Sequence, residues 1–128
     1  IILDEPYKYH NGATIKNYDN KYLGPITIRK ALSDSRNIPA VKLFNEIGYD
    51  KAFNFAEKIG VTRPKIIYES EAIGGSTVGY TLLELANAYQ SFANLGYFKK
   101  ASSIKEICYL TKTYKNNVFN LIFIEFIS

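Results

Sequence analysis

The sequence predicts a mostly α-helical fragment of an α+β domain. Apolar residues recur at helical spacing in three stretches between residues 39 and 93, and capping residues or glycines bound each stretch. The flanking regions, residues 1–24 and 97–127, lack this period and carry turn and strand signals instead. The chain has 128 residues, of which 47% are hydrophobic and 22% charged, as in one ordinary globular domain.

The N-terminal region, residues 1–24, is rich in turn residues and tyrosine. Asn11-Gly12 predicts a hairpin turn, because both residue types tolerate a positive φ. We expect a surface hairpin or loop packed on a helical body. Interleaved tyrosine and lysine can also stack bases, but the lysines are scattered and the net charge is only +4, so no nucleic acid partner is expected.

Two helices are predicted on either side of residue 35. Thr27 caps a short helix over residues 27–32. Pro39 suits the first position of the next helix, and it predicts a break in the helical conformation at Asn37-Ile38. Gly48 is expected to end this helix. The apolar stripe of this second helix, expected to be core, is Ala40, Val41, Phe44 and Ile47.

A third helix is predicted between Asp50, as its N-cap, and Gly60. Its stripe, also expected to be core, is Ala52, Phe53, Ala56 and Ile59. One short glycine-led turn separates it from the second helix, which predicts an antiparallel helix pair.

Residues 61–80 lack a helical period. Gly74-Gly75-Ser76-Thr77 does not match the phosphate-loop pattern, so the two glycines predict a sharp bend or a close backbone approach. Thr81 and Glu84 then form a capping box that begins the strongest helix, and Asn94-Leu95-Gly96 ends it. Its apolar face is Leu82, Leu85, Ala86, Tyr89, Phe92 and Ala93.

The C-terminal region changes character. Residues 97–109 can supply a strand, and residues 118–127 form an apolar run too short to span a bilayer. That run could be a buried strand, an exposed sticky edge, or out-of-frame sequence.

The stretch Ser33-Asp34-Ser35-Arg36-Asn37 lies between the first two predicted helices. Ser35 and Asn37 share a tight corner, where their side chains can point together into a cleft. A hydroxyl and a carboxamide offer uncharged donors and acceptors that suit holding a substrate amide and relaying a proton. The alternative is that these residues simply cap helices.

Three blocks together are more specific: residues 17–19 with 21–27, residues 31–43, and residues 81–89 with 92–96. In this order and at these spacings, residues 4–107 resemble the transpeptidase domain of bacterial class A penicillin-binding proteins. The motif set of that family is S-x-x-K, S-x-N and K-T-G. The resemblance implies a mostly α fragment of an α+β penicillin-recognising (β-lactamase/transpeptidase-like) domain, cut from a peptidoglycan D,D-transpeptidase.

By this resemblance, Ser35-Arg36-Asn37 is the S-x-N motif. The resemblance implies that Ser35 is catalytic and relays a proton toward the leaving-group nitrogen. It implies that Asn37 is catalytic and substrate-binding, hydrogen-bonding the amide of the acyl-donor peptide and helping to position the first-motif lysine. Arg36, at the variable middle position, is expected to be structural or at the cleft rim. The implied reaction is serine acyl transfer between stem peptides, and β-lactams would acylate the same serine. No cofactor or metal is expected.

The other two motifs are not assigned. The only S-x-x-K, residues 102–105, follows the S-x-N instead of preceding it, so we interpret it as coincidence. Lys112-Thr113-Tyr114 has tyrosine where K-T-G has glycine. His10 and Cys108 have no partner evident in the sequence. We therefore expect the fragment alone to be inactive, and residues 108–128, which do not match the family, to be a frameshifted or truncated tail.

The parent protein is expected to act on the extracytoplasmic face of the bacterial cell membrane. Class A relatives carry a glycosyltransferase domain and a membrane anchor, and their partners are stem peptides and β-lactams. We expect marginal stability, because helices without the sheet they cover expose apolar faces. Two alternatives stay open: a non-catalytic truncated remnant, and an unrelated helical module that binds peptide or glycan through the tyrosine-rich region. A β-lactamase relative is less favoured, because residues 81–96 resemble the synthetic enzymes.

Overall fold

The computed structural model describes residues 1–101, 106–109 and 112–115. The chain divides into two compact units: Ile1–Phe53 with Pro64–Val78, and Asn54–Arg63 with the residues from Gly79 onward. Among the described residues, helices supply most of the regular structure, as predicted, and the strands are all short.

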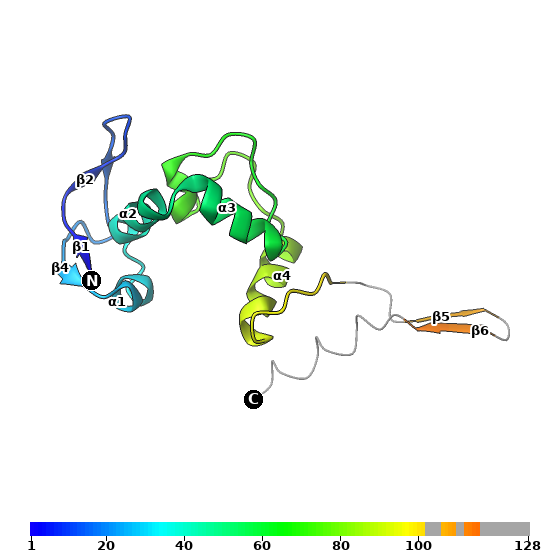
Figure 1. Ribbon diagram of the computed structural model, residues 1–128. Helices are drawn as coiled ribbons and strands as arrows, with labels where there is room; N and C mark the ends of the chain where they lie inside the picture. Colours follow the sequence, from blue (N-terminus) through cyan, green and yellow to red (C-terminus); the bar gives the residue numbers. More distant parts are fainter. Residues whose placement is uncertain (102–105, 110–111, 116–128) are drawn as a thin grey trace. The chain divides into compact units, whose positions relative to one another are not determined.

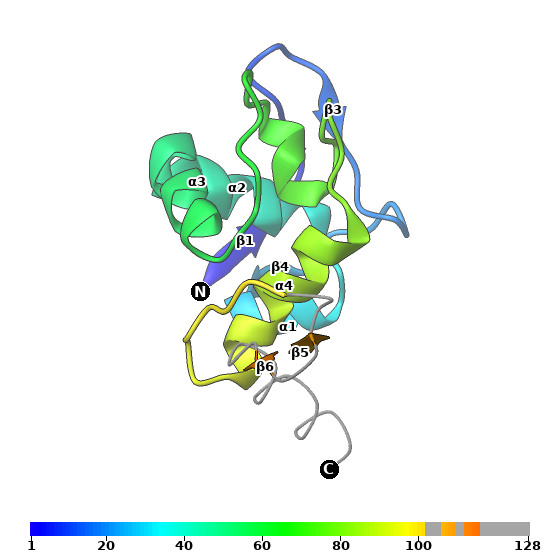
Figure 2. The same ribbon diagram turned by 90° about the vertical axis from the view of Figure 1, so that its right-hand side faces the viewer.

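Two short antiparallel strand pairs open the first unit. β2 (Tyr7–Lys8) pairs with β3 (Thr14–Ile15), and Gly12 adopts a φ of 84° in the turn between them, which confirms the predicted hairpin. β1 (Ile2–Asp4) pairs with β4 (Gly24–Ile26), a pairing that the sequence did not reveal. The β1–β4 pair lies beside helices α1 and α2 (Figure 1 and Figure 2).

Helix α1 (Ile28–Ser33) begins as predicted, with the Thr27 hydroxyl accepting a hydrogen bond from the Lys30 N–H at 3.1 Å. Helix α2 (Asn37–Ile47) ends as predicted at Gly48, whose φ is 87°. The predicted break at Asn37-Ile38 is wrong, because both residues are already helical and the break lies at Ser35 and Arg36. Pro39 causes no conflict there, since the first-turn N–H groups of a helix have no intrahelical partner.

The buried core of the first unit is small and lies between the β2–β3 hairpin and α2. Ile15, Ile38 and Val41 form it, and Tyr7, Tyr9 and Ala72 pack against them. Ala72 belongs to η1 (Glu69–Ile73), a 3₁₀ helix that the sequence did not reveal and that contacts α2. Of the predicted α2 stripe only Val41 is fully buried, and Ile47 is 44% exposed.

The glycine pair after η1 behaves as predicted. Gly74 adopts a left-handed conformation with φ 84° and ends the 3₁₀ helix. A Cβ atom on Gly75 would lie 2.6 Å from the Cβ of Ser70, so this is a close backbone approach that only glycine permits.

Helix α3 (Tyr49–Lys58) begins one residue earlier than predicted, so Asp50 lies in its first turn and is not its N-cap. Gly48 alone separates α2 from α3, and the two helices make few contacts with each other, so the predicted antiparallel pair does not form. The Phe44 ring instead stacks on Tyr49 and meets the edge of Phe53 around this junction.

The second unit is organised by α4 (Leu82–Ala93), whose capping box between Thr81 and Glu84 is formed as predicted. The Thr62 hydroxyl also donates to Glu84, and the hydrogen bonds from Thr62 and Thr81 lower the pKa of Glu84 to about 2. The predicted apolar face is exposed: Leu82 is 88% and Phe92 71% accessible. The buried residues of α4 are Asn87, Ala88 and Ser91.

Two described strands follow α4 in the chain. β5 (Glu106–Tyr109) lies within the predicted strand region and pairs antiparallel with β6 (Lys112–Lys115), which contains the K-T-Y sequence. The S-x-x-K at residues 102–105 and the apolar run at residues 118–127 lie outside the described residues.

Candidate functional site

The S-x-N sequence occupies the corner between α1 and α2. Ser35 is exposed and adopts a φ of 52°, the left-handed region that non-glycine residues rarely enter. Its N–H donates to the Leu32 carbonyl at 3.1 Å, which ends α1. Arg36 is the extended residue before α2, and Asn37 is the first residue of that helix.

Ser35 and Asn37 both line one groove, with a volume of about 470 Å³, whose remaining walls are mostly apolar. Ile2, Leu32, Leu43 and Ile73 are among the residues that form these walls. The corner of the S-x-N sequence therefore supplies polar atoms at the edge of an apolar groove, a combination typical of small-molecule and peptide sites.

The two polar side chains differ in how they are held. The Asn37 Nδ2 donates to the Lys16 carbonyl at 2.8 Å, which fixes the plane of the carboxamide. Among residues 1–101, 106–109 and 112–115, we find no hydrogen-bond partner for the Ser35 hydroxyl or for the Asn37 Oδ1. One hydroxyl and one amide oxygen are thus placed to meet a ligand's donors and acceptors.

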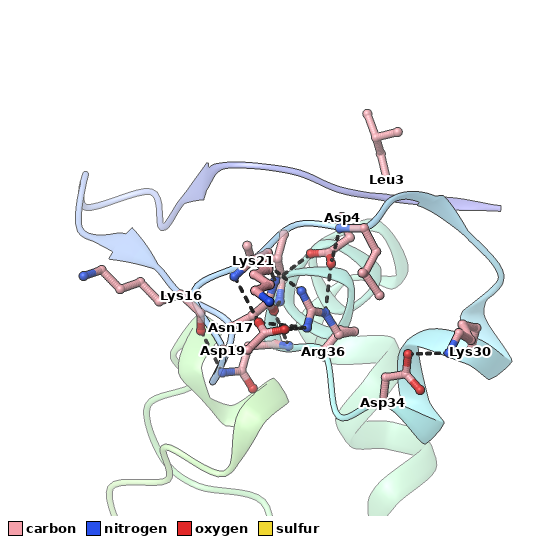
Figure 3. A network of polar contacts seen from close by, with 12 residues as sticks. Leu3, Asp4, Lys16, Asn17, Asp19, Lys21, Lys30, Asp34 and Arg36 are labelled. Atoms are coloured by element: carbon pink, nitrogen blue, oxygen red, sulfur yellow. Dashed lines mark hydrogen bonds and ion pairs between the residues drawn. The ribbon is translucent and has the colours of Figure 1, made fainter.

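Arg36 lies beneath the corner and is only 4% exposed. Its Nε donates to Asp4 Oδ2 at 2.9 Å, and its Nη1 donates to both carboxylate oxygens of Asp19 at 3.0 Å (Figure 3). Its Nη2 donates to the Lys21 carbonyl. Burial by itself would lower the pKa of Arg36, but the hydrogen bonds and charges of Asp19 and Asp4 outweigh it and raise the pKa above its ordinary value. Arg36 is thus buried and hydrogen-bonded, as expected of a structural residue, and it also lines the groove.

Asn17 completes this network and was not singled out as a site residue by the sequence. Its Oδ1 accepts from the N–H groups of Asn37 at 2.9 Å and of Ile38 at 3.3 Å, so a distant side chain caps α2. Its Nδ2 donates to Asp4 Oδ1 at 2.8 Å and to the Lys21 carbonyl at 2.9 Å (Figure 3). The only sequence signal for Asn17 was its presence in the first block of the family resemblance.

His10, which had no evident partner in the sequence, contacts Glu69. The Glu69 carboxylate accepts from the His10 N–H at 2.7 Å and from Asn45 Nδ2 at 2.6 Å, and His10 Nδ1 lies 2.9 Å away. Burial would raise the pKa of Glu69, but these hydrogen bonds outweigh it and the pKa is lowered. The contact fastens the β2–β3 hairpin to η1 and α2, which is a structural role.

Within the described part of the chain, no group of histidine, cysteine, aspartate and glutamate side chains is arranged to hold a metal ion. No described helix combines the length and the apolar character that crossing a membrane requires.

The comparisons with known proteins decide the family. The sequence model for the "Penicillin binding protein transpeptidase domain" matches residues 1–121. The chain belongs to the penicillin-binding protein transpeptidase family. Membership implies the penicillin-recognising fold, as the sequence resemblance predicted. The family match extends past residue 107, where the sequence resemblance stops. The origin of residues 108–128 stays a prediction.

Three relatives illustrate the similarity of this transpeptidase segment to class A proteins. It is 42% identical over 109 residues to penicillin-binding protein 1A/1B of Bacillus subtilis, covering 83% of this chain and 12% of that protein. It is 37% identical over 116 residues to penicillin-binding protein 1A of Streptococcus pneumoniae, covering 85% of this chain and 16% of that protein. It is 44% identical over 92 residues to penicillin-binding protein 1A of Aquifex aeolicus, covering 72% of this chain and 12% of that protein.

Proposed function

We propose that this segment forms one wall of the acyl-transfer site of a peptidoglycan D,D-transpeptidase that crosslinks stem peptides outside the cytoplasmic membrane. The observation that carries the proposal is the S-x-N corner, where Ser35 and Asn37 line the same groove in a chain of the transpeptidase family. We assign no nucleophilic serine within residues 1–128, because the only S-x-x-K there, residues 102–105, follows Ser35.

The two corner residues take different parts in the reaction. A serine supplied by the rest of the protein attacks the carbonyl of the D-Ala-D-Ala bond, and the amide nitrogen leaves with a proton. The Ser35 hydroxyl relays that proton, since it can accept and donate at once. The Asn37 Oδ1 accepts from an N–H of the donor peptide, while its Nδ2 stays bonded to the Lys16 carbonyl. The site binds β-lactams because their ring amide presents the same carbonyl to the same serine.

A hybrid protein tests the proposal. The 109 matched residues of the Bacillus subtilis relative are replaced by those of this chain, and acylation by a fluorescent penicillin is followed over time. We expect the hybrid to be labelled. Ser35→Ala is expected to slow acylation and crosslinking on the order of 100-fold, which is the range of a lost proton relay. Asn37→Ala should weaken binding of the donor peptide as well.

Ser33→Ala is the matched control. Ser33 lies two residues away in α1, its hydroxyl donates to the Lys30 carbonyl at 3.0 Å, and it does not line the groove of Ser35 and Asn37. Its acylation rate should equal that of the unsubstituted hybrid. A Ser35→Ala hybrid that acylates and crosslinks at the unsubstituted rate would contradict the proposed role of Ser35. An intact host that is labelled while the folded hybrid is not would favour the non-catalytic remnant.

A further inference from the structure

We infer that Asp4, Asn17 and Arg36 are positioning residues that hold the Ser35–Asn37 corner in its working shape. The inference rests on the proposed function and extends it to side chains that do not touch the substrate. It assigns a specific task to the middle residue of the S-x-N motif, which pairs the corner with the N-terminal strand.

Contacts within residues 35–37 alone do not fix the conformation of the Ser35–Asn37 corner. Ser35 sits in the left-handed region at φ 52°, which costs energy for a residue with a Cβ atom, so neighbouring contacts must impose it. Arg36 makes no side-chain cap for α2, so local sequence does not satisfy the first N–H groups of that helix. Asn17 satisfies them from a segment 20 residues earlier in the chain.

Each side of the corner is tied to the same carboxylate. Asp4 Oδ2 accepts from Arg36 Nε at 2.9 Å, and Asp4 Oδ1 accepts from Asn17 Nδ2 at 2.8 Å (Figure 3). Arg36 follows Ser35 directly, and Asn17 holds the N–H of Asn37. A change in Asp4 therefore moves both ends of the motif together.

Because its three side chains are buried, the network keeps one geometry. Asp4 is 0%, Asn17 2% and Arg36 4% exposed, so water cannot replace a lost partner without rearrangement. The guanidinium donates in three directions, to Asp4, Asp19 and the Lys21 carbonyl, which fixes its plane. Lysine offers no such fork, so it cannot take its place.

The first test uses nuclear magnetic resonance on the 128-residue chain. Asn17→Asp and Asp19→Asn lie far from the corner in sequence and should still shift the amide signals of Ser35 and Asn37, while the signals of the β2–β3 hairpin stay in place. Asp19→Asn removes the partly exposed partner of Arg36 and is the mild variant if the other unfolds. Glu5→Gln is the matched control, because it breaks a neighbouring, more exposed ion pair with Lys42. Unmoved corner signals in folded Asn17→Asp and Asp19→Asn chains would overturn the inference.

The second test measures acylation by fluorescent penicillin in the hybrid protein. Arg36→Lys should slow acylation at least about tenfold in hybrid protein that is still folded, since small misplacements of reacting groups are costly. Glu5→Gln should leave the rate unchanged. A corner that moves with no loss of rate would overturn the positioning role. If the unsubstituted hybrid fails to react, the proposed function fails, and the magnetic resonance result still decides whether the network holds the corner.

Discussion

Ile38→Ala should strongly destabilise the first unit of the chain. Ile38 is 0% exposed and packs with Ile15 and Val41, so the substitution removes buried carbon atoms and leaves a cavity. Substitutions of this type cost about 2–5 kcal/mol, a large part of the roughly 5–15 kcal/mol that stabilises a native domain. Because Ile38 follows Asn37 directly, the same change loosens the S-x-N corner.

Leu32→Ala is the matched control, because it removes the same number of carbon atoms from a residue that is 82% exposed. Its cost should stay within about 0.5 kcal/mol. Urea unfolding is followed through the amide signals of α2. With a slope of about 1.5 kcal/mol/M, a loss of 3 kcal/mol moves the midpoint by about 2 M. Equal midpoints for the two variants would refute the assignment of the core.

Three further predictions concern local contacts. The pKa of Glu69 is lowered from its ordinary value of 4.5, so its ionised form stabilises the fold fully above that pH and loses this effect as pH falls through the folded pKa. Unfolding midpoints of Glu69→Gln should therefore depend less on pH than those of the parent between pH 6 and 3. Thr81→Ala should cost about 1 kcal/mol of α4 stability by removing the N-cap, and should raise the pKa of Glu84 from about 2 when followed by carboxyl resonances. Gly75→Ala should destabilise the turn after η1, because the new methyl group would meet Ser70 Cβ at 2.6 Å, and Ser70→Gly should partly restore the melting temperature.

The helices could be predicted because their ends are encoded locally. Thr27 and Thr81 each accept from an N–H three residues later, and Gly48 takes a positive φ directly after α2. Such contacts lie within one turn of helix, so spacing alone reveals them. The start of α2 was misplaced because its cap, Asn17, lies 20 residues away and leaves no local pattern.

The buried faces could not be predicted in the same way. The periodicity of α4 identifies an apolar face, yet Leu82 and Phe92 are exposed while Asn87 and Ser91 are buried. A stripe says which residues favour burial, but the segments available to cover them decide which residues are buried.

The candidate site could likewise be predicted only in part. The identity of Ser35 and Asn37 as candidates came from the motif and from the family resemblance, and both line the groove. The residues that build the corner did not come from the sequence. Asp4 and Arg36 are 32 positions apart, and no period or motif joins them. Long-range polar contacts of this kind become visible only when the chain is folded.

The network around Arg36 is better explained by the orientation that it imposes on the Arg36 side chain than by a gain in stability. Replacing a buried ion pair by well-packed apolar residues is often neutral or stabilising by about 1–4 kcal/mol, so stability alone gives no reason to bury Arg36 and Asp4. Apolar side chains, however, pack in many orientations, whereas a guanidinium with partners in three directions has one. That orientation fixes the backbone of residue 36, and with it the positions of the Ser35 and Asn37 side chains at the corner. A reaction that needs a hydroxyl and an amide at set positions gains from this constraint even if the fold does not.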